Sequence, residues 1–144
     1  MVGFRQDTKV EALKRSPLFE DPSRKQLAHL AGLTDDLEVP AGTVVCKEGN
    51  RGREFFVIIE GEATVTRDGK QVATIASGDF FGEIALLERV VRTATVSAAT
   101  PLSFFVITDQ AFRAVLNTDP GIERKILRTL ARRLLSMSGD PKMP

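Results

Sequence analysis

The residues with the clearest chemistry in this sequence lie between positions 82 and 92. Gly82 is followed by Glu83 and the helix-favouring run Ile84-Ala85-Leu86-Leu87, so a short helical turn would begin where the backbone is least hindered. The unpaired N–H groups of such a turn and the positive end of its dipole favour an anion. Arg92 follows nine residues after Glu83 and carries a planar fork of donors that suits a phosphate.

The two charged side chains suit different parts of one ligand. A carboxylate such as Glu83 repels phosphate but accepts hydrogen bonds, so a ribose hydroxyl is its natural partner, while Arg92 suits the attached phosphate. The alternation in Thr93-Ala94-Thr95-Val96 predicts that Arg92 returns to the site on a β-strand. The alternative interpretation is that Glu83 and Arg92 form an ordinary ion pair that braces a turn.

Three stretches of different composition surround these residues. The pattern from Lys9 to Leu33 is helical, with a helix start at Asp21-Pro22-Ser23. From Leu37 to Thr108, short segments rich in Val, Ile, Phe and Thr predict a small antiparallel barrel or sandwich. Asp109 and the Thr118-Asp119-Pro120 signal open two further helices, the second running to about Ser136. The turns within the β stretch are Pro40-Ala41-Gly42, Glu48-Gly49-Asn50, Gly61, Asp68-Gly69 and Ser77-Gly78-Asp79.

The overall composition narrows the function classes. The 144 residues are 42% hydrophobic and 27% charged, which predicts one ordinary globular domain. The net charge of +1 provides no field that would attract nucleic acid or a membrane surface. Cys46 is the only cysteine and His29 the only histidine, so we expect no intrachain disulfide, no metal centre and no histidine-based catalysis. The expected location is the cytoplasm, because the sequence shows neither a signal peptide nor a membrane span.

The stretch from Phe81 to Val96 closely resembles the phosphate-binding cassette of cyclic nucleotide-binding domains, whose pattern is roughly FGE(I/L)AL, a short turn, then R(T/S/A)A(T/S)V. The resemblance implies an α+β fold, in which an antiparallel, jelly-roll-like β-roll (a double-stranded β-helix) is flanked by N-terminal helices and by C-terminal B and C helices. The implied divisions are residues 1–35 for the N-terminal helices, 36–108 for the β-roll with its cassette at 81–96, 109–137 for the C-terminal helices, and 138–144 for a disordered tail.

The resemblance also implies the ligand, which is cyclic AMP or, as the second choice, cyclic GMP, with no further cofactor. Gly82 and Glu83 would hold the ribose 2′-hydroxyl, the Ala85 N–H and the Arg92 side chain would hold the cyclic phosphate, and the Thr93 hydroxyl would add a contact. The ligand-binding set of the cassette is completed by Phe81, Ile84 and Ala94. One departure from the family pattern is Val91, which stands where many members have proline.

The last helix carries two features that bear on function. Leu127, Leu130, Leu134 and Met137 repeat at spacings of three and four, which predicts a stripe packed on its own domain or, as the alternative, the seam of a homodimer. By the resemblance, Arg133 is placed to fold over the base of the bound nucleotide.

Together these features predict a regulatory domain that reports cyclic nucleotide binding by moving its C-terminal helices. The effector domain or protein would lie outside this chain, and no DNA-reading helix fits after Ser136. One alternative is a domain of the same fold that has lost the nucleotide and serves as a protein-interaction module. A small β-barrel enzyme is the other, and the single histidine argues against it.

Overall fold

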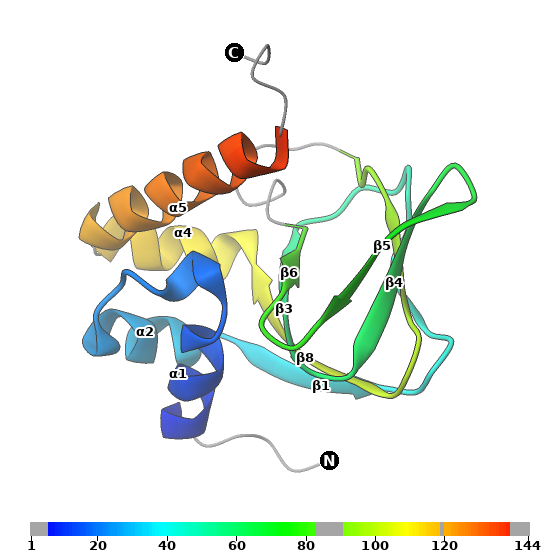
Figure 1. The fold of residues 1–144 in the computed structure, drawn as a ribbon. Helices are drawn as coiled ribbons and strands as arrows, with labels where there is room; N and C mark the ends of the chain where they lie inside the picture. The colour runs from blue at the N-terminus through cyan, green and yellow to red at the C-terminus, as the bar shows by residue number, and fades with distance from the viewer. Residues whose placement is uncertain (1–5, 83–90, 119, 139–144) are drawn as a thin grey trace.

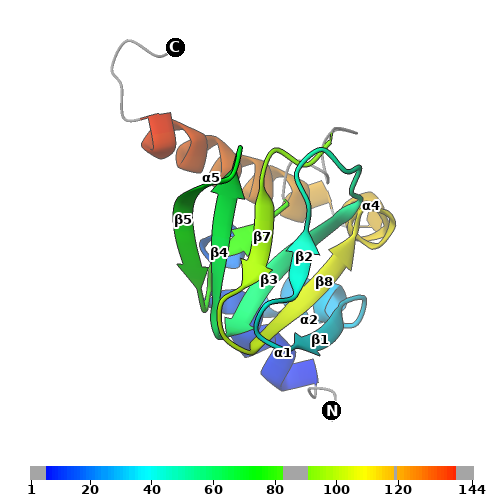
Figure 2. The same ribbon diagram turned by 90° about the vertical axis from the view of Figure 1, so that its right-hand side faces the viewer.

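The computed structural model describes residues 6–82, 91–118 and 120–138, which form two antiparallel sheets and a layer of helices (Figure 1). The first sheet has the order β1-β8-β3-β6 and the second the order β2-β7-β4-β5. Figure 2 shows the two sheets facing each other as a roll, with the helices gathered against the first sheet. This arrangement confirms the predicted antiparallel β-roll with flanking helices. The strands are β1 (Asp35–Val39), β2 (Val44–Cys46), β3 (Glu54–Glu60), β4 (Glu62–Arg67), β5 (Lys70–Ala76), β6 (Phe80–Phe81), β7 (Thr95–Ala98) and β8 (Leu102–Thr108).

The central strand β3 is buried on both faces, which explains its unbroken apolar sequence. Phe55 and Val57 point toward the helices and join the first hydrophobic core, whereas Phe56 and Ile58 point between the two sheets and join the second core. Successive side chains of a strand alternate between faces, so one strand supplies both cores. The sheet β1-β8-β3-β6 is therefore the wall that separates the helices from the interior of the roll.

The hairpin between β4 and β5 has the predicted turn. Asp68 and Gly69 have φ values of 53° and 77°, the left-handed conformation that a two-residue type I′ turn needs at both central positions. The pairing of β4 with β5 runs from Glu62↔Ala76 to Arg67↔Lys70. The turn therefore sets the register of the sheet edge.

The N-terminal region from Lys9 to Leu33, predicted to be helical with a helix start at Asp21-Pro22-Ser23, is divided into short elements. It consists of α1 (Gln6–Lys14), the 3-10 turn η1 (Pro17–Phe19) and α2 (Arg24–Ala31). Ser23 is the N-cap of α2, as predicted, and forms a capping box with Gln26. Pro17 stands at the start of η1, because a proline cannot continue the preceding helix.

The C-terminal helices are α4 (Asp109–Thr118) and α5 (Pro120–Ser138), close to the predicted ranges. In α5, Ile126 is 1% and Thr129 6% exposed, whereas Leu127 is 42% exposed. The prediction that Leu127 packs on its own domain is therefore wrong. The heptad pattern predicted Leu127 as the inward-facing residue, but the neighbouring residue Ile126 occupies that position. The side chains of Leu130, Leu134 and Met137, and the tail at 139–144, lie outside what the structure describes.

Within the described residues, no helix is long and apolar enough to cross a membrane.

Two serines of the N-terminal helices are expected to have opposite effects on stability. The Ser16 hydroxyl is fully buried and has no hydrogen-bond partner among the described residues, so Ser16→Ala should raise the free energy of unfolding by up to about 1 kcal/mol. The Ser23 hydroxyl accepts from the Gln26 N–H at 3.2 Å, so Ser23→Ala should lower it by about 1 kcal/mol. Urea denaturation of both variants tests this. A clear loss of stability in Ser16→Ala would show that the Ser16 hydroxyl makes a stabilising contact.

Candidate cyclic phosphate site

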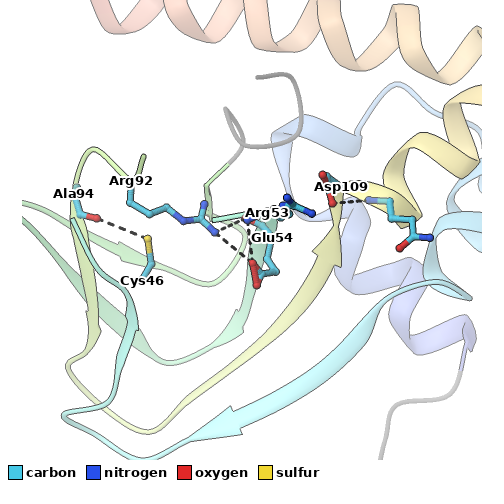
Figure 3. Close-up of polar contacts among 7 residues, drawn as sticks. Cys46, Arg53, Glu54, Arg92, Ala94 and Asp109 are labelled. Atoms are coloured by element: carbon cyan, nitrogen blue, oxygen red, sulfur yellow. Dashed lines mark hydrogen bonds and ion pairs between the residues drawn. The ribbon is translucent and has the colours of Figure 1, made fainter. Parts of the chain in front are cut away.

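Arg92 is the centre of the site, and its side chain is only 9% exposed. Its Nη2 donates to the backbone oxygen of Glu54 at 2.8 Å and lies 3.9 Å from the Glu54 carboxylate (Figure 3). The guanidinium carbon lies 5.6 Å from the centroid of the Phe56 ring, in cation–π range. The first residues of β3 therefore hold the guanidinium over the mouth of the second core.

Two glycines make room for this guanidinium. A Cβ atom on Gly52 would lie 2.0 Å from Arg92 Nε, and one on Gly82 would lie 2.6 Å from Arg92 Nη1. Gly82 also has a φ of 80°, a conformation that residues with side chains rarely adopt. The predicted role of Gly82, a close backbone approach, is thus directed at Arg92 in this structure. Gly52 has the same role, which the sequence did not reveal.

Arg92 does not lie on a regular strand, contrary to the expectation from the alternating residues after it. Strand β7 begins three residues later, at Thr95. Instead, the Arg92 N–H donates to Asn50 O at 2.8 Å and the Gly49 N–H donates to Arg92 O at 2.9 Å. The next pair along, Arg51 and Val91, is an isolated bridge. The loop before β3 therefore fixes the backbone of Arg92 in the absence of a continuous ladder.

The floor below Arg92 is apolar and contains the single cysteine. Phe81 stacks on Phe56 with ring centroids 4.7 Å apart and an interplanar angle of 17°. The Cys46 thiol donates to Ala94 O at 3.7 Å, as Figure 3 shows. Burial raises the pKa of this thiol, and the positive charge of Arg92 opposes part of that rise. The thiol therefore stays protonated and acts as a small apolar residue with one weak donor.

The segment after Arg92 is tied to the second sheet by side chains. Arg67 Nε donates to Thr93 O at 3.1 Å, and the Glu48 N–H donates to Thr95 Oγ1 at 3.0 Å. The Asp68 N–H in turn donates to Glu48 Oε1 at 3.1 Å. The β4–β5 turn, the loop before β3 and the segment that carries Arg92 thus form one connected unit.

The structure brings together five of the predicted site residues, namely Phe81, Gly82, Arg92, Thr93 and Ala94. Glu83, Ile84 and Ala85 lie outside the described residues. Arg133 belongs to α5 by its backbone, and nothing is described of its side chain.

Sequence reasoning missed three residues that hold Arg92: Gly52, Glu54 and Phe56. The available signal was the pair of glycines three residues apart, Gly49 and Gly52, directly before the apolar strand.

A hollow of about 460 Å³ lies next to this site. It mixes positive and negative side chains, and Thr108 and Asp109 already accept hydrogen bonds from the backbone of α4. Arg92 is not among the residues that line the hollow, so the hollow is distinct from the phosphate site. The lining is formed by Arg51, Gly52, Arg53, Glu54, Thr108, Asp109 and Gln110. In the part of the chain that the structure describes, no cluster of three His, Cys, Asp or Glu side chains could hold a metal ion.

Comparison with known proteins identifies the family. Residues 36–119 match the family described as "Cyclic nucleotide-binding domain", so the chain belongs to the cyclic nucleotide-binding domain family. Domains of this family are regulatory. The matched residues include the β-roll from Asp36 onward and the Arg92 site.

Two curated relatives are similar over most of this chain. A cyclic nucleotide-gated potassium channel of Rhizobium etli is 35% identical over 126 residues, which are 88% of this chain and 34% of the channel. The cAMP-dependent protein kinase regulatory subunit of Schizosaccharomyces pombe is 34% identical over 116 residues, 79% of this chain and 28% of that protein. The chain therefore spans about a third of the length of these relatives.

Solved structures agree with the fold. The N-terminal domain of a transcriptional regulator from Streptomyces coelicolor A3(2) has a TM-score of 0.78 at 27% identity, covering 88% of this chain and 92% of that one. The regulatory domain of Toxoplasma gondii PKA, crystallised with cAMP, has a TM-score of 0.70 at 26% identity, covering 76% of this chain and 44% of that one.

Gly52→Ala should displace Arg92 without unfolding the domain. The added methyl group would clash with the far end of a flexible side chain, which can swing away at little cost, so Tm should change by only a few degrees. Affinity for a cyclic nucleotide, measured by calorimetry, should fall by roughly tenfold or more, because the guanidinium leaves its position for the phosphate.

The matched control is Gly42→Ala. Gly42 has a φ of 90°, and the space that a methyl group would occupy there is open, so alanine strains the backbone at a turn whose N–H donates to Ala98 O rather than to Arg92. This variant should lose stability while keeping its affinity. Equal affinities of wild type and Gly52→Ala would show that Arg92 does not need this position.

Proposed function

We propose that this chain is the receptor part of a regulatory protein and binds cyclic AMP, with cyclic GMP as the second candidate, through Arg92. The observation that carries the proposal is the buried guanidinium of Arg92, positioned by Glu54 and Phe56 and accommodated by two glycines. Its Nη2 is engaged, and among the described residues neither Nη1 nor Nε donates a hydrogen bond. The N–H groups of these two nitrogens are the donors that remain for phosphate oxygens.

The relatives support a cyclic nucleotide as the ligand and are compatible with either adenine or guanine as its base. The S. pombe relative is a cAMP-dependent regulatory subunit, and the Toxoplasma regulatory domain was crystallised with cAMP. A further relative, 29% identical over 114 residues (79% of this chain), is a cGMP-dependent protein kinase of Caenorhabditis elegans. The Thr93 hydroxyl beside Arg92 suits either nucleotide, since it can accept from an amino group or donate to a phosphate oxygen.

The remaining contacts of the ligand fall to cassette residues outside the described part of the chain. In this proposal Glu83 accepts from the ribose 2′-hydroxyl, the Ala85 N–H donates to the phosphate, and Ile84 adds apolar contact. Phe81 and Ala94 form the floor beside Arg92. Glu83 is a carboxylate, but nothing else in this set supplies a nucleophile or electrophile for it to act on, so the proposed role is binding rather than catalysis.

Occupancy would be reported through the C-terminal helices. The last helix, α5, packs against η1, and Lys125 of α5 donates to the Gln26 side chain of α2 at 3.1 Å. A ligand shifts such an arrangement only if it binds one position of the helices more tightly than the other. Arg133 would provide that difference by closing over the base. The effector would be a domain or protein beyond this chain, and a homodimer through α5 is the alternative use of the helix.

Arg92→Ala tests the phosphate contact. Loss of one partner from a largely buried charge pair costs on the order of 3–5 kcal/mol, so affinity for cyclic AMP should fall at least a hundredfold. Isothermal titration calorimetry on the wild type and the variant measures this.

Arg53→Ala is the matched control, because it removes an equal charge from the neighbouring exposed arginine. It should bind within about threefold of wild type, as expected for an exposed charge. A loss below threefold in Arg92→Ala with the fold intact would place the anion elsewhere. Failure of the wild type to bind either nucleotide would favour the alternative, an interaction module of the same fold.

Arg133→Ala tests whether Arg133 acts as a lid, that is, whether its side chain closes over the base of the bound nucleotide. If Arg133 stacks on the base, its loss should weaken binding by about 0.5–2 kcal/mol. The effect should appear mainly as faster dissociation, since a lid closes after the phosphate has docked. Stopped-flow dissociation of a fluorescent cyclic nucleotide measures it, with the exposed neighbour Arg132→Ala as control. Unchanged dissociation together with a dimeric solution mass would assign α5 to the dimer seam.

A further inference from the structure

The last helix, α5, has an outer face on which arginines lie beside leucines. Ile126 and Thr129 of α5 are buried against the domain, so the opposite side of the helix faces solvent. Figure 1 shows α5 at the margin of the molecule, above α4, with no other described helix or strand on its far side. Side chains four apart on a helix form an inclined ridge. The exposed outer face consists of an arginine ridge (Arg124, Arg128 and Arg132) and, next to it, a leucine ridge (Leu127, Ala131 and Leu135).

The charge of the arginine ridge is not compensated within the described part of the chain. None of its three arginines forms an ion pair or a side-chain hydrogen bond with a described residue. Helix α5 contains five arginine or lysine residues and one glutamate, whereas the rest of the chain has three more acidic than basic residues. The small net charge of the chain therefore conceals a basic helix on an acidic remainder, and this helix attracts a negatively charged partner.

The leucine ridge adds an apolar contact to this charge. Leu127 is 42% and Leu135 66% exposed, and both are among the large apolar side chains that the described fold leaves at the surface. A nucleic acid would use the arginines through its phosphates and would have little use for the leucines. The combination of both ridges is typical of a helix that meets either an amphipathic partner helix or a lipid surface.

The small residue in the middle of the leucine ridge favours a partner helix. Two helices that pack by ridges of residues four apart cross with their axes about 8–10 Å apart, and small side chains at the crossing point allow the closer approach. Ala131 provides such a point between the two leucines. A lipid surface would be served better by a large apolar residue there, because its affinity grows with the apolar area that is buried.

A second copy of this chain fits this face poorly. Two copies that cross at Ala131 would bring their arginine ridges within about one Debye length of each other, roughly 8–10 Å, where like charges repel. We propose that the outer face of α5 docks an acidic amphipathic helix of a protein partner, whose apolar residues pack beside Ala131 and whose Asp or Glu side chains pair with the arginine ridge. This inference rests on the proposed function for its regulatory role, since α5 is the helix that would report occupancy, but the contact itself needs no nucleotide.

Two synthetic helical peptides and a charge reversal test the contact. Both peptides carry the same stripe of leucine and alanine, flanked by glutamates in one and by lysines in the other. Wild type should bind the glutamate peptide roughly tenfold or more tighter than the lysine peptide, and Arg128→Glu should reverse this preference. Lys70→Glu makes the same charge change at an exposed residue of β5 and should leave both affinities within about twofold. Fluorescence anisotropy measures the affinities, and circular dichroism checks that each variant is folded.

Ala131→Leu separates a partner helix from a membrane. The larger side chain should weaken the glutamate peptide by about fivefold, because it holds the two helices apart, whereas it should strengthen binding to vesicles that contain phosphatidylserine. Equal binding of the two peptides by wild type would overturn the proposal. Vesicle binding without a preference for the glutamate peptide would assign the face to a membrane instead. A dimeric solution mass that Ala131→Leu converts to a monomer would assign it to a second copy of the chain.

The proposed function is tested separately, because none of these measurements contains a nucleotide. If wild type binds the glutamate peptide but neither cyclic AMP nor cyclic GMP, the docking face stands and the domain is an interaction module. If wild type binds cyclic AMP and does not distinguish the two peptides, the proposed function stands and the docking face fails.

Discussion

The site depends on the contact between the guanidinium of Arg92 and the first residues of β3. Arg92 is nearly removed from solvent, yet its nearest carboxylate is 3.9 Å away and belongs to a side chain that is 42% exposed. The stronger contact is the neutral backbone oxygen of Glu54, at 2.8 Å. A buried cation with such incomplete compensation favours an anion that can supply further acceptors. The two glycines leave room for the cation at this position, and the Phe56 ring lies within cation–π distance of it.

The sheet that carries this contact also supports the helices, because β3 alternates between two cores. Phe55 packs edge-on against Phe19 of η1, with ring centroids 5.9 Å apart, and Phe56 lies under Arg92 from the opposite face. The site and the helical layer are therefore separated by the thickness of one strand. A domain of 144 residues has no room for independent cores, and here the same seven-residue strand is the boundary of both.

Local sequence signals predicted the parts of the fold that depend on backbone conformation. The Asp68-Gly69 turn and the Ser23 cap follow from the φ values and hydrogen bonds that those residue types favour. The cassette pattern singled out Gly82 and Arg92, which lie against each other in the structure. Contacts between distant segments were not predictable: Gly52 and Glu54 meet Arg92 across about forty positions, and only the folded register shows this. The heptad pattern failed at Leu127 because spacings of three and four fit more than one helix face, and packing selects Ile126.

The contacts of β3 also indicate how the helices could respond to a ligand. Any shift of Arg92 toward a phosphate acts on Glu54 O and on the Phe56 ring, which flank Phe55 on the same strand. Because Phe55 is fully buried against Phe19, β3 cannot move without either dragging η1 or opening a gap in the first core. Opening a gap would lose an aromatic contact that is worth on the order of 1 kcal/mol beyond its buried area. The 3-10 turn η1 packs against α5, so under the proposed function a displacement of η1 would act on the last helix through this direct contact.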